Sequence, residues 1–180
     1  MQTKILNSPF QIKELAANGY VMGYASVFGK VDAMREVVQP GAFRRSLKSW
    51  KNDARSPAML WMHDPSKPVG VWERLHEDSS GLIAEGRIAV KTAAGGDAYE
   101  LLKMGAVTGL SIGYRTVTSR IDQKSRVRHL TDVDLFEVSL VTFPANASAR
   151  IHAVKAPNLY TDDIGAIVAR INATAQLLRN

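Results

Sequence analysis

Seven segments of the chain are rich in β-forming residues, and several of them alternate apolar with polar positions. A period of two is typical of strands that bury one face. Two of the segments flank Ser79 and Ser80, with Gly81 at the turn exit, which predicts a hairpin. The predicted strands are 19–28, 34–39, 57–62, 69–78, 81–90, 108–121 and 126–143.

Apolar residues spaced three or four apart predict helices at three further places. The first two are 41–50 and 92–106. The third is 161–180, for which Thr161 or Asp162 can serve as the N-cap. Its apolar stripe consists of Ile164, Ile167, Val168, Ile171 and Leu178.

Many strands with few helices predict an α+β protein. We expect a mostly antiparallel sheet of about seven strands that closes, or nearly closes, into a barrel surrounded by helices. Residues 1–151 are predicted to form this barrel domain, and 152–180 a linker followed by the last helix. That helix packs either on its own barrel or on a partner. In the second case it would be an association element, and the protein a homo-oligomer.

The composition is that of an ordinary globular domain, with 46% apolar and 22% charged residues among 180. Because the chain has no cysteine, it can form neither a disulfide nor a thiolate metal site. The four histidines do not have a close, ligand-like spacing. We therefore expect neither a metal nor a cofactor.

The net charge of +6 raises the question of nucleic acid binding. However, the basic residues are scattered and are not interleaved with aromatic ones, as single-strand binding would require. A solvated basic face, or one that meets an acidic protein, is the favoured interpretation. No apolar stretch approaches about 18 residues and no signal peptide is evident, so the chain is expected to stay in the cytoplasm of the cell that makes it.

The hexapeptide GLSIGY, residues 109–114, places Ser111 between two glycines. GLSIG matches the nucleophile motif of α/β-hydrolases, but that motif needs a sharp strand-to-helix turn, and here β-forming residues continue. In a strand, Gly109, Ser111 and Gly113 share a face that another backbone, such as a peptide substrate, can approach closely. Alternatively, the glycines mark a bulge or barrel corner and Ser111 has no chemical role.

A serine hydroxyl needs a base to become a good nucleophile, and histidine is the usual base near neutral pH. His63 ends the run MLWMH and starts an Asp-Pro turn, which places it at the rim of a strand, both anchored and accessible. The other histidines, His76, His129 and His152, come from polar or loop-like stretches. His63 is therefore the candidate base.

The candidate acid is Glu137, which interrupts the nearly continuous apolar strand 133–143. A carboxylate buried there without a partner would be costly, so we expect it to orient an imidazole or to pair with an arginine or lysine. The alternation places Glu137 on one face with Val133 and Leu135. Asp132 and Asp134 fall on the other face and are the alternatives.

With His63, Ser111 and Glu137 in that order, the sequence resembles the prohead (procapsid) maturation proteases of tailed bacteriophages. The resemblance covers roughly residues 19–151. The stretches that carry it are GYASVFG (23–29), VVQPGAFRRSL (37–47), WMHDPSKPVG (61–70), GLIAEGRI (81–88), GLSIGY (109–114) and LFEVSLVTFPANASARI (135–151).

The resemblance implies a serine endopeptidase that cleaves the scaffold region of the major capsid protein, or a separate scaffold protein, inside the assembling prohead in the host cytoplasm. It also implies a fold similar to that of assemblin, the herpesvirus capsid-maturation protease. Ser111 is then the nucleophile and His63 the general base. Assemblin uses a second histidine as third member, whereas this chain offers Glu137, with Asp134 and His129 as alternatives.

An oxyanion hole is also needed, and the turn at 144–147 is the candidate, with backbone N–H groups of Ala145 and Asn146. Two rival functions remain open from the sequence. One is an unrelated serine hydrolase acting on esters or small amides. The other is a non-catalytic capsid-assembly or binding module that keeps the same barrel.

Overall fold

The structure, a computed structural model, describes residues 19–153. The predicted helix over 161–180 lies outside the described residues, as does most of the predicted linker. Eight strands and two helices follow one another along the described chain. They are β1 (Tyr20–Val27), β2 (Glu36–Val38), α1 (Arg44–Asn52), β3 (Ala58–Trp61), β4 (Asp64–Glu77), β5 (Gly81–Ile88), α2 (Ala93–Lys103), β6 (Gly109–Ile121), β7 (Arg128–Val141) and β8 (Ile151–Ala153).

Each of the seven predicted strand segments contains or overlaps an observed strand, and the first two predicted helices are also present. The two main differences are an earlier start of one strand and one additional strand. Strand β4 begins at Asp64, five residues earlier than predicted, and runs through Pro65 and Pro68. Strand β8 was not predicted, because three residues at the end of a loop-like stretch carry no periodic signal.

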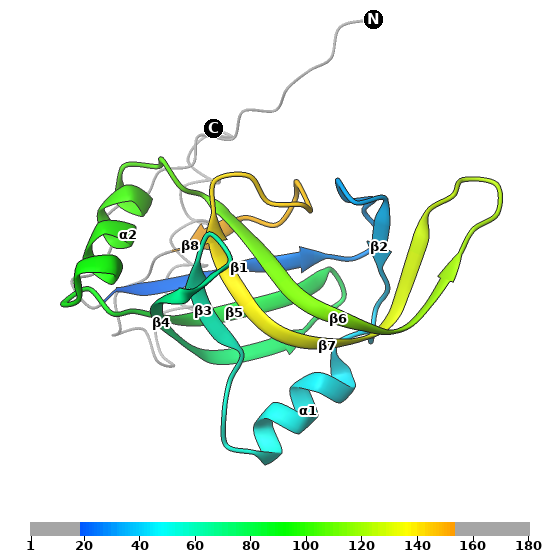
Figure 1. Cartoon of the computed structure of the whole chain (residues 1–180), viewed down its shortest axis with the longest axis horizontal. Coiled ribbons are helices and arrows are strands. Elements are labelled where there is room, and N and C mark those ends of the chain that lie inside the picture. The colour runs from blue at the N-terminus through cyan, green and yellow to red at the C-terminus, as the bar shows by residue number, and fades with distance from the viewer. Residues whose placement is uncertain (1–18, 154–180) are drawn as a thin grey trace, which may run out of the picture.

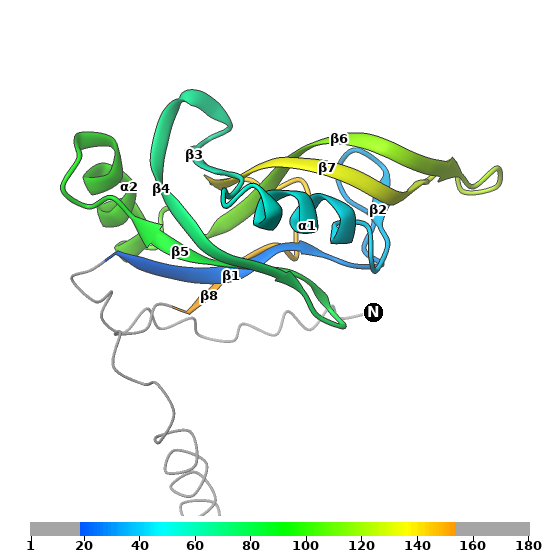
Figure 2. The same cartoon turned by 90° about the horizontal axis from the view of Figure 1, so that it is seen from below.

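The strands form one curled sheet with the order β2-β7-β3-β4-β5-β1-β8, and β6 pairs with β7 (Figures 1 and 2). The predicted barrel of about seven strands, closed or nearly closed, is corrected to a half-barrel of eight. Among residues 19–153, the gap between β6 and β1 is bridged by residues 149–151, through Leu110 N–H to Ala149 O (3.2 Å) and Ile151 N–H to Thr108 O (3.0 Å). So few bonds do not close the sheet into a continuous barrel.

Five of the seven strand pairings are antiparallel, as predicted, but β7 pairs in parallel with both β2 and β3. The 14 residues of β7 are long enough for its first part to pair with β2 and its last part with β3. β7 is thus the strand that connects most of the sheet. The core lies within the curl and includes Leu82, Leu110, Leu130 and Leu140, all fully buried.

A bulge in β7 corrects the predicted face of Glu137. The pairing with β6 shifts between Gly113, opposite Glu137, and Tyr114, opposite Leu135, so that Phe136 is an extra residue. Past this point Val138 and Leu140 continue the buried face that Val133 and Leu135 begin. Glu137 therefore points away from that face. A strict period of two cannot anticipate an inserted residue.

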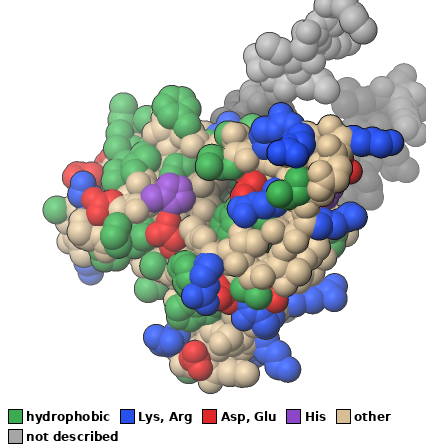
Figure 3. All heavy atoms as spheres, turned by 45° about the vertical axis from the view of Figure 1, so that its right-hand side comes forward, with side chains coloured by type: hydrophobic (Ala, Val, Ile, Leu, Met, Phe, Trp, Pro, Cys, Tyr) green, Lys and Arg blue, Asp and Glu red, His purple; other side chains and the backbone are tan. Residues whose placement is uncertain are grey.

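Charged side chains are dispersed over the surface. Figure 3 shows lysine and arginine side chains mainly on the right and lower parts of one face, separated by polar and hydrophobic ones. No helix within residues 19–153 is long and apolar enough to cross a membrane.

Candidate active site

His63 lies in a two-residue hairpin turn between β3 and β4, where Trp61 pairs with Asp64. Met62 and His63 have positive φ angles of 52° and 61°. Such turns favour Asn-Gly, since each non-glycine residue held in a sparsely populated region costs about 1–3 kcal/mol. The Met62 N–H donates to Leu140 O (3.0 Å), which attaches the turn to β7. Strain that persists in this way is typical of functional positions.

The imidazole of His63 is hydrogen-bonded to Glu137 through Nδ1 and Oε1. An ionised carboxylate can only accept, so Nδ1–H is the donor and Nε2 of a neutral ring keeps a free lone pair. The Ser139 hydroxyl donates to the same Oε1 (3.2 Å). The side chain of Glu137 is 15% exposed and that of His63 43%. The acid is therefore held from two sides, while the ring stays accessible.

Ser111 lies on β6 directly opposite Ser139 and is largely buried. It lines a cavity of about 170 Å³ together with His63, Ala145 and Asn146. Four of the five predicted site residues thus meet at one cavity. Glu137 reaches it through its hydrogen bond to His63.

Gly113 provides the space that the acid occupies. A Cβ atom at this position would lie 2.4 Å from Glu137 Cγ and 2.7 Å from its Oε1. These separations are well below van der Waals contact, so no side chain fits there unless Glu137 moves. The second glycine of GLSIGY, Gly113, therefore leaves space for the Glu137 carboxylate. The sequence pattern indicated only that another backbone could approach this face.

The turn that carries Ala145 and Asn146 is fixed to two other segments. Ala145 O accepts from Ala33 N–H (2.9 Å), and Asn146 Nδ2 donates to Val27 O (2.9 Å). Within residues 19–153, the backbone N–H groups of Ala145 and Asn146 donate no hydrogen bond. Both residues line the cavity, and their N–H groups have no acceptor among the described residues.

An ion-pair network forms another wall of the cavity. Glu36 is buried and accepts from the Tyr114 hydroxyl and from Arg128 Nε (2.6 Å). Burial and the bond to Glu36 raise the pKa of Tyr114 well above its usual value. Asp32 accepts backbone N–H groups from Met34 and Glu36, and burial raises its pKa. Sequence reasoning missed these groups, because no local motif marks them.

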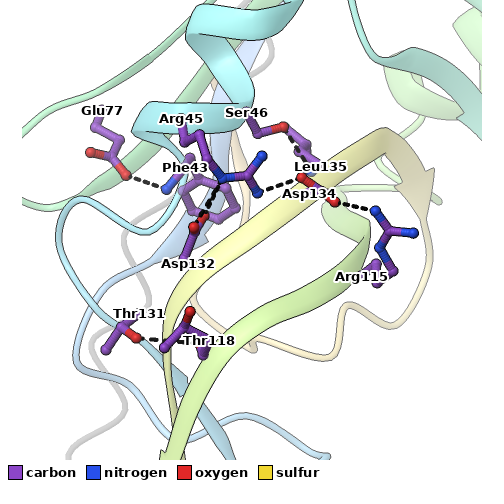
Figure 4. A network of polar contacts seen from close by, with 10 residues as sticks. All are labelled: Phe43, Arg45, Ser46, Glu77, Arg115, Thr118, Thr131, Asp132, Asp134 and Leu135. Carbon is purple, nitrogen blue, oxygen red and sulfur yellow. Dashed lines mark hydrogen bonds and ion pairs between the residues drawn. The ribbon is translucent and has the colours of Figure 1, made fainter.

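The alternative acids have other partners. Asp132 and Asp134 both pair with Arg45 of α1, and Asp134 also accepts from Arg115 (2.6 Å), as Figure 4 shows. The guanidinium groups of Arg45 and Arg115 lower the pKa of Asp134. His129 Nδ1 is hydrogen-bonded to Gln39 Nε2 (3.2 Å). Among the candidates considered, Glu137 is the one that contacts His63.

A larger hollow lies elsewhere on the described chain. It measures about 1170 Å³, runs between α1 and β4, and contains none of the predicted site residues. Within residues 19–153 no group of three or more histidine, cysteine, aspartate or glutamate side chains could hold a metal ion.

Comparisons with known proteins show the family of the chain. The model of the caudovirus prohead serine proteases matches residues 8–162 of the chain. The chain belongs to this family. The prohead protease of Enterobacteria phage HK97 is 34% identical over 139 residues, which make up 76% of this chain and 60% of that protein. The chain thus spans about three fifths of that relative of the family.

Among solved structures, the capsid assembly protease of bacteriophage T4 matches with a TM-score of 0.57 and 14% identity, over 69% of this chain and 82% of that one. At this identity the similarity shows a shared fold. The varicella-zoster virus protease matches with a TM-score of 0.45 and 14% identity, over 73% and 62% of the two chains. The relation to assemblin therefore stays a prediction.

Proposed function

We propose that this family member is a serine endopeptidase in which Ser111 is the nucleophile, His63 the general base and Glu137 the orienting acid. The observation that carries the proposal is the hydrogen bond of His63 to Glu137 at the cavity that Ser111 lines. The three residues come from three separate strands or turns. Strain at the His63 turn and the missing side chain at Gly113 both support a geometry built for this contact.

The chemistry follows from these groups. His63 Nε2 takes the proton of Ser111 Oγ as that oxygen bonds to the carbonyl carbon, and the carbonyl oxygen becomes an oxyanion. The N–H groups of Ala145 and Asn146 stabilise it. The C–N bond then breaks, and the leaving amine receives the proton from His63. A water that His63 deprotonates then bonds to the acyl carbon, the ester bond from that carbon to Ser111 Oγ breaks, and His63 returns the proton to Oγ.

We further propose that the substrate is the scaffold region of the major capsid protein or a separate scaffold protein, cut inside the assembling prohead in the host cytoplasm. The names of the relatives, a prohead protease and a capsid assembly protease, support this substrate class. Cleavage of an extended segment also agrees with the partly exposed side chain of His63.

The test is co-expression of the chain with the capsid precursor of the same phage, followed by mass spectrometry of the products. Cleavage by the wild-type chain that is lost with Ser111→Ala supports the proposal. An intact precursor contradicts it. A fluorophosphonate probe then separates the rival functions, because labelling at Ser111 indicates another serine hydrolase and no labelling indicates a non-catalytic module.

Gly113→Ala is expected to lower turnover by about 10²-fold or more, because the new Cβ displaces the Glu137 carboxylate from His63. The matched control is Gly96→Ala within α2, where a Cβ meets one atom at 3.3 Å and helix propensity favours alanine. Cleavage rates of the two variants check the prediction. Equal rates would show that Glu137 does not need this space.

A further inference from the structure

Strand β1 carries a bulge at the end that borders the active-site cavity. Its pairing with β5 shifts between Tyr24, opposite Ile83, and Ser26, opposite Leu82, which leaves Ala25 as the extra residue. Up to Ala25, the strand alternates between half-buried and buried positions. Without the bulge, Ser26 would share the half-buried face of Tyr24. The bulge turns it inward, and bulges beside active sites commonly re-aim side chains in this way.

The inward turn buries a hydroxyl without a partner. Ser26 is 1% exposed, and its Oγ makes no hydrogen bond within residues 19–153. Burial of an unpaired hydroxyl is unfavourable, and most buried polar groups in folded proteins are paired. Alanine would fill the same space at no such cost. The unpaired hydroxyl of Ser26 therefore needs a hydrogen-bond partner from outside the described residues.

The position of Ser26 indicates where that partner binds. Ser26 lines the same cavity as Ser111 and His63. The next residue, Val27, accepts the hydrogen bond from Asn146 that holds the proposed oxyanion turn. Ser26 and the proposed reacting residues therefore border the same cavity.

We propose that Ser26 is a substrate-binding residue whose hydroxyl donates a hydrogen bond to a carbonyl oxygen of the peptide bound at Ser111. This inference rests on the proposed function. A hydroxyl has one proton to donate, and carbonyl oxygens are the acceptors that an extended peptide brings. The bound peptide then satisfies the buried hydroxyl, so the cost of burial is relieved only in the complex.

The test compares Ser26→Ala and Ser26→Cys with the wild-type full chain, on a fluorogenic peptide that spans the cleavage site mapped by mass spectrometry. Ser26→Ala is expected to lower kcat/KM by about 5- to 100-fold, mainly through KM, because the lost contact serves binding. Ser26→Cys, with a weak donor, should fall similarly. The melting temperature of both should equal or exceed that of the wild type, because no protein contact is lost.

Ser46→Ala is the matched control. Ser46 is also buried, at 4% exposure, but its Oγ accepts from Leu135 N–H (2.9 Å). That variant should melt about 2–4 °C lower and cleave normally below its melting temperature. If the wild type cleaves the peptide and Ser26→Ala has an unchanged kcat/KM, the role of Ser26 is overturned and the proposed function is not. A melting temperature for Ser26→Ala as low as that of Ser46→Ala also overturns it. Absence of cleavage by the wild type refutes the proposed function itself.

Discussion

Ser111→Ala and His63→Ala are each expected to abolish cleavage of the capsid precursor while leaving the fold intact. Members of a catalytic unit depend on one another, so each loss should be on the order of 10⁴-fold or more, and the double variant should be little worse than either single one. Rates of precursor cleavage, measured by gel or mass spectrometry, check this, and circular dichroism checks the fold.

The controls come from the same elements of the sheet. Ser119 lies on β6 with Ser111 but is exposed, so Ser119→Ala should cleave at the wild-type rate. His129→Ala removes an imidazole that contacts Gln39 and no carboxylate, and it should also remain active. If His63→Ala kept more than about a tenth of the activity, histidine would have no part in the mechanism.

Glu137→Gln should keep the protein folded and reduce turnover by about 10²- to 10⁴-fold. The amide has nearly the same shape as the carboxylate but carries no charge to stabilise the imidazolium, and it can hold the wrong tautomer of His63. Because Glu137 contacts His63 and not a protein cation, the loss should appear in kcat more than in stability. Steady-state kinetics on a cleavable peptide measure the change.

Asp134→Asn is the comparison variant, and it should show the opposite pattern to Glu137→Gln. It weakens the pairs with Arg45 and Arg115, so its effect should fall on stability and not on turnover. An inactive Asp134→Asn beside an active Glu137→Gln would transfer the orienting role to the other carboxylate.

The sequence was informative about this site wherever the signal was local. Ser111, His63 and Glu137 could be selected because each stands out from its own strand, as a serine between glycines, a histidine at a strand end and an acid in an apolar run. The family resemblance then assigned these three residues to one catalytic site. The strand segments were predictable for the same reason, since β-forming residues gather within short windows.

The features that the sequence did not predict depend on pairing between segments that are distant in the sequence. The bulges at Phe136 and Ala25 change which face a side chain takes, and a bulge is defined by the partner strand. The parallel pairing of β3 with β7 places His63 beside Glu137, although 74 residues separate them. Nothing in the stretch GYASVFG showed that the hydroxyl of Ser26 would be buried without a partner.

The central place of β7 also governs when activity can arise during synthesis. The turn with His63 is attached to β7, and Glu137 belongs to it, so neither the anchor nor the acid exists until the ribosome has passed residue 140. At about 5–20 residues per second, the imidazole precedes its carboxylate by about 4–15 s. Ser111 follows His63 along the chain, so a growing chain carries both residues without the acid only for the last 26 residues of that interval, or about 1–5 s. The catalytic alignment that we propose therefore arises only after most of the described sheet has been synthesised.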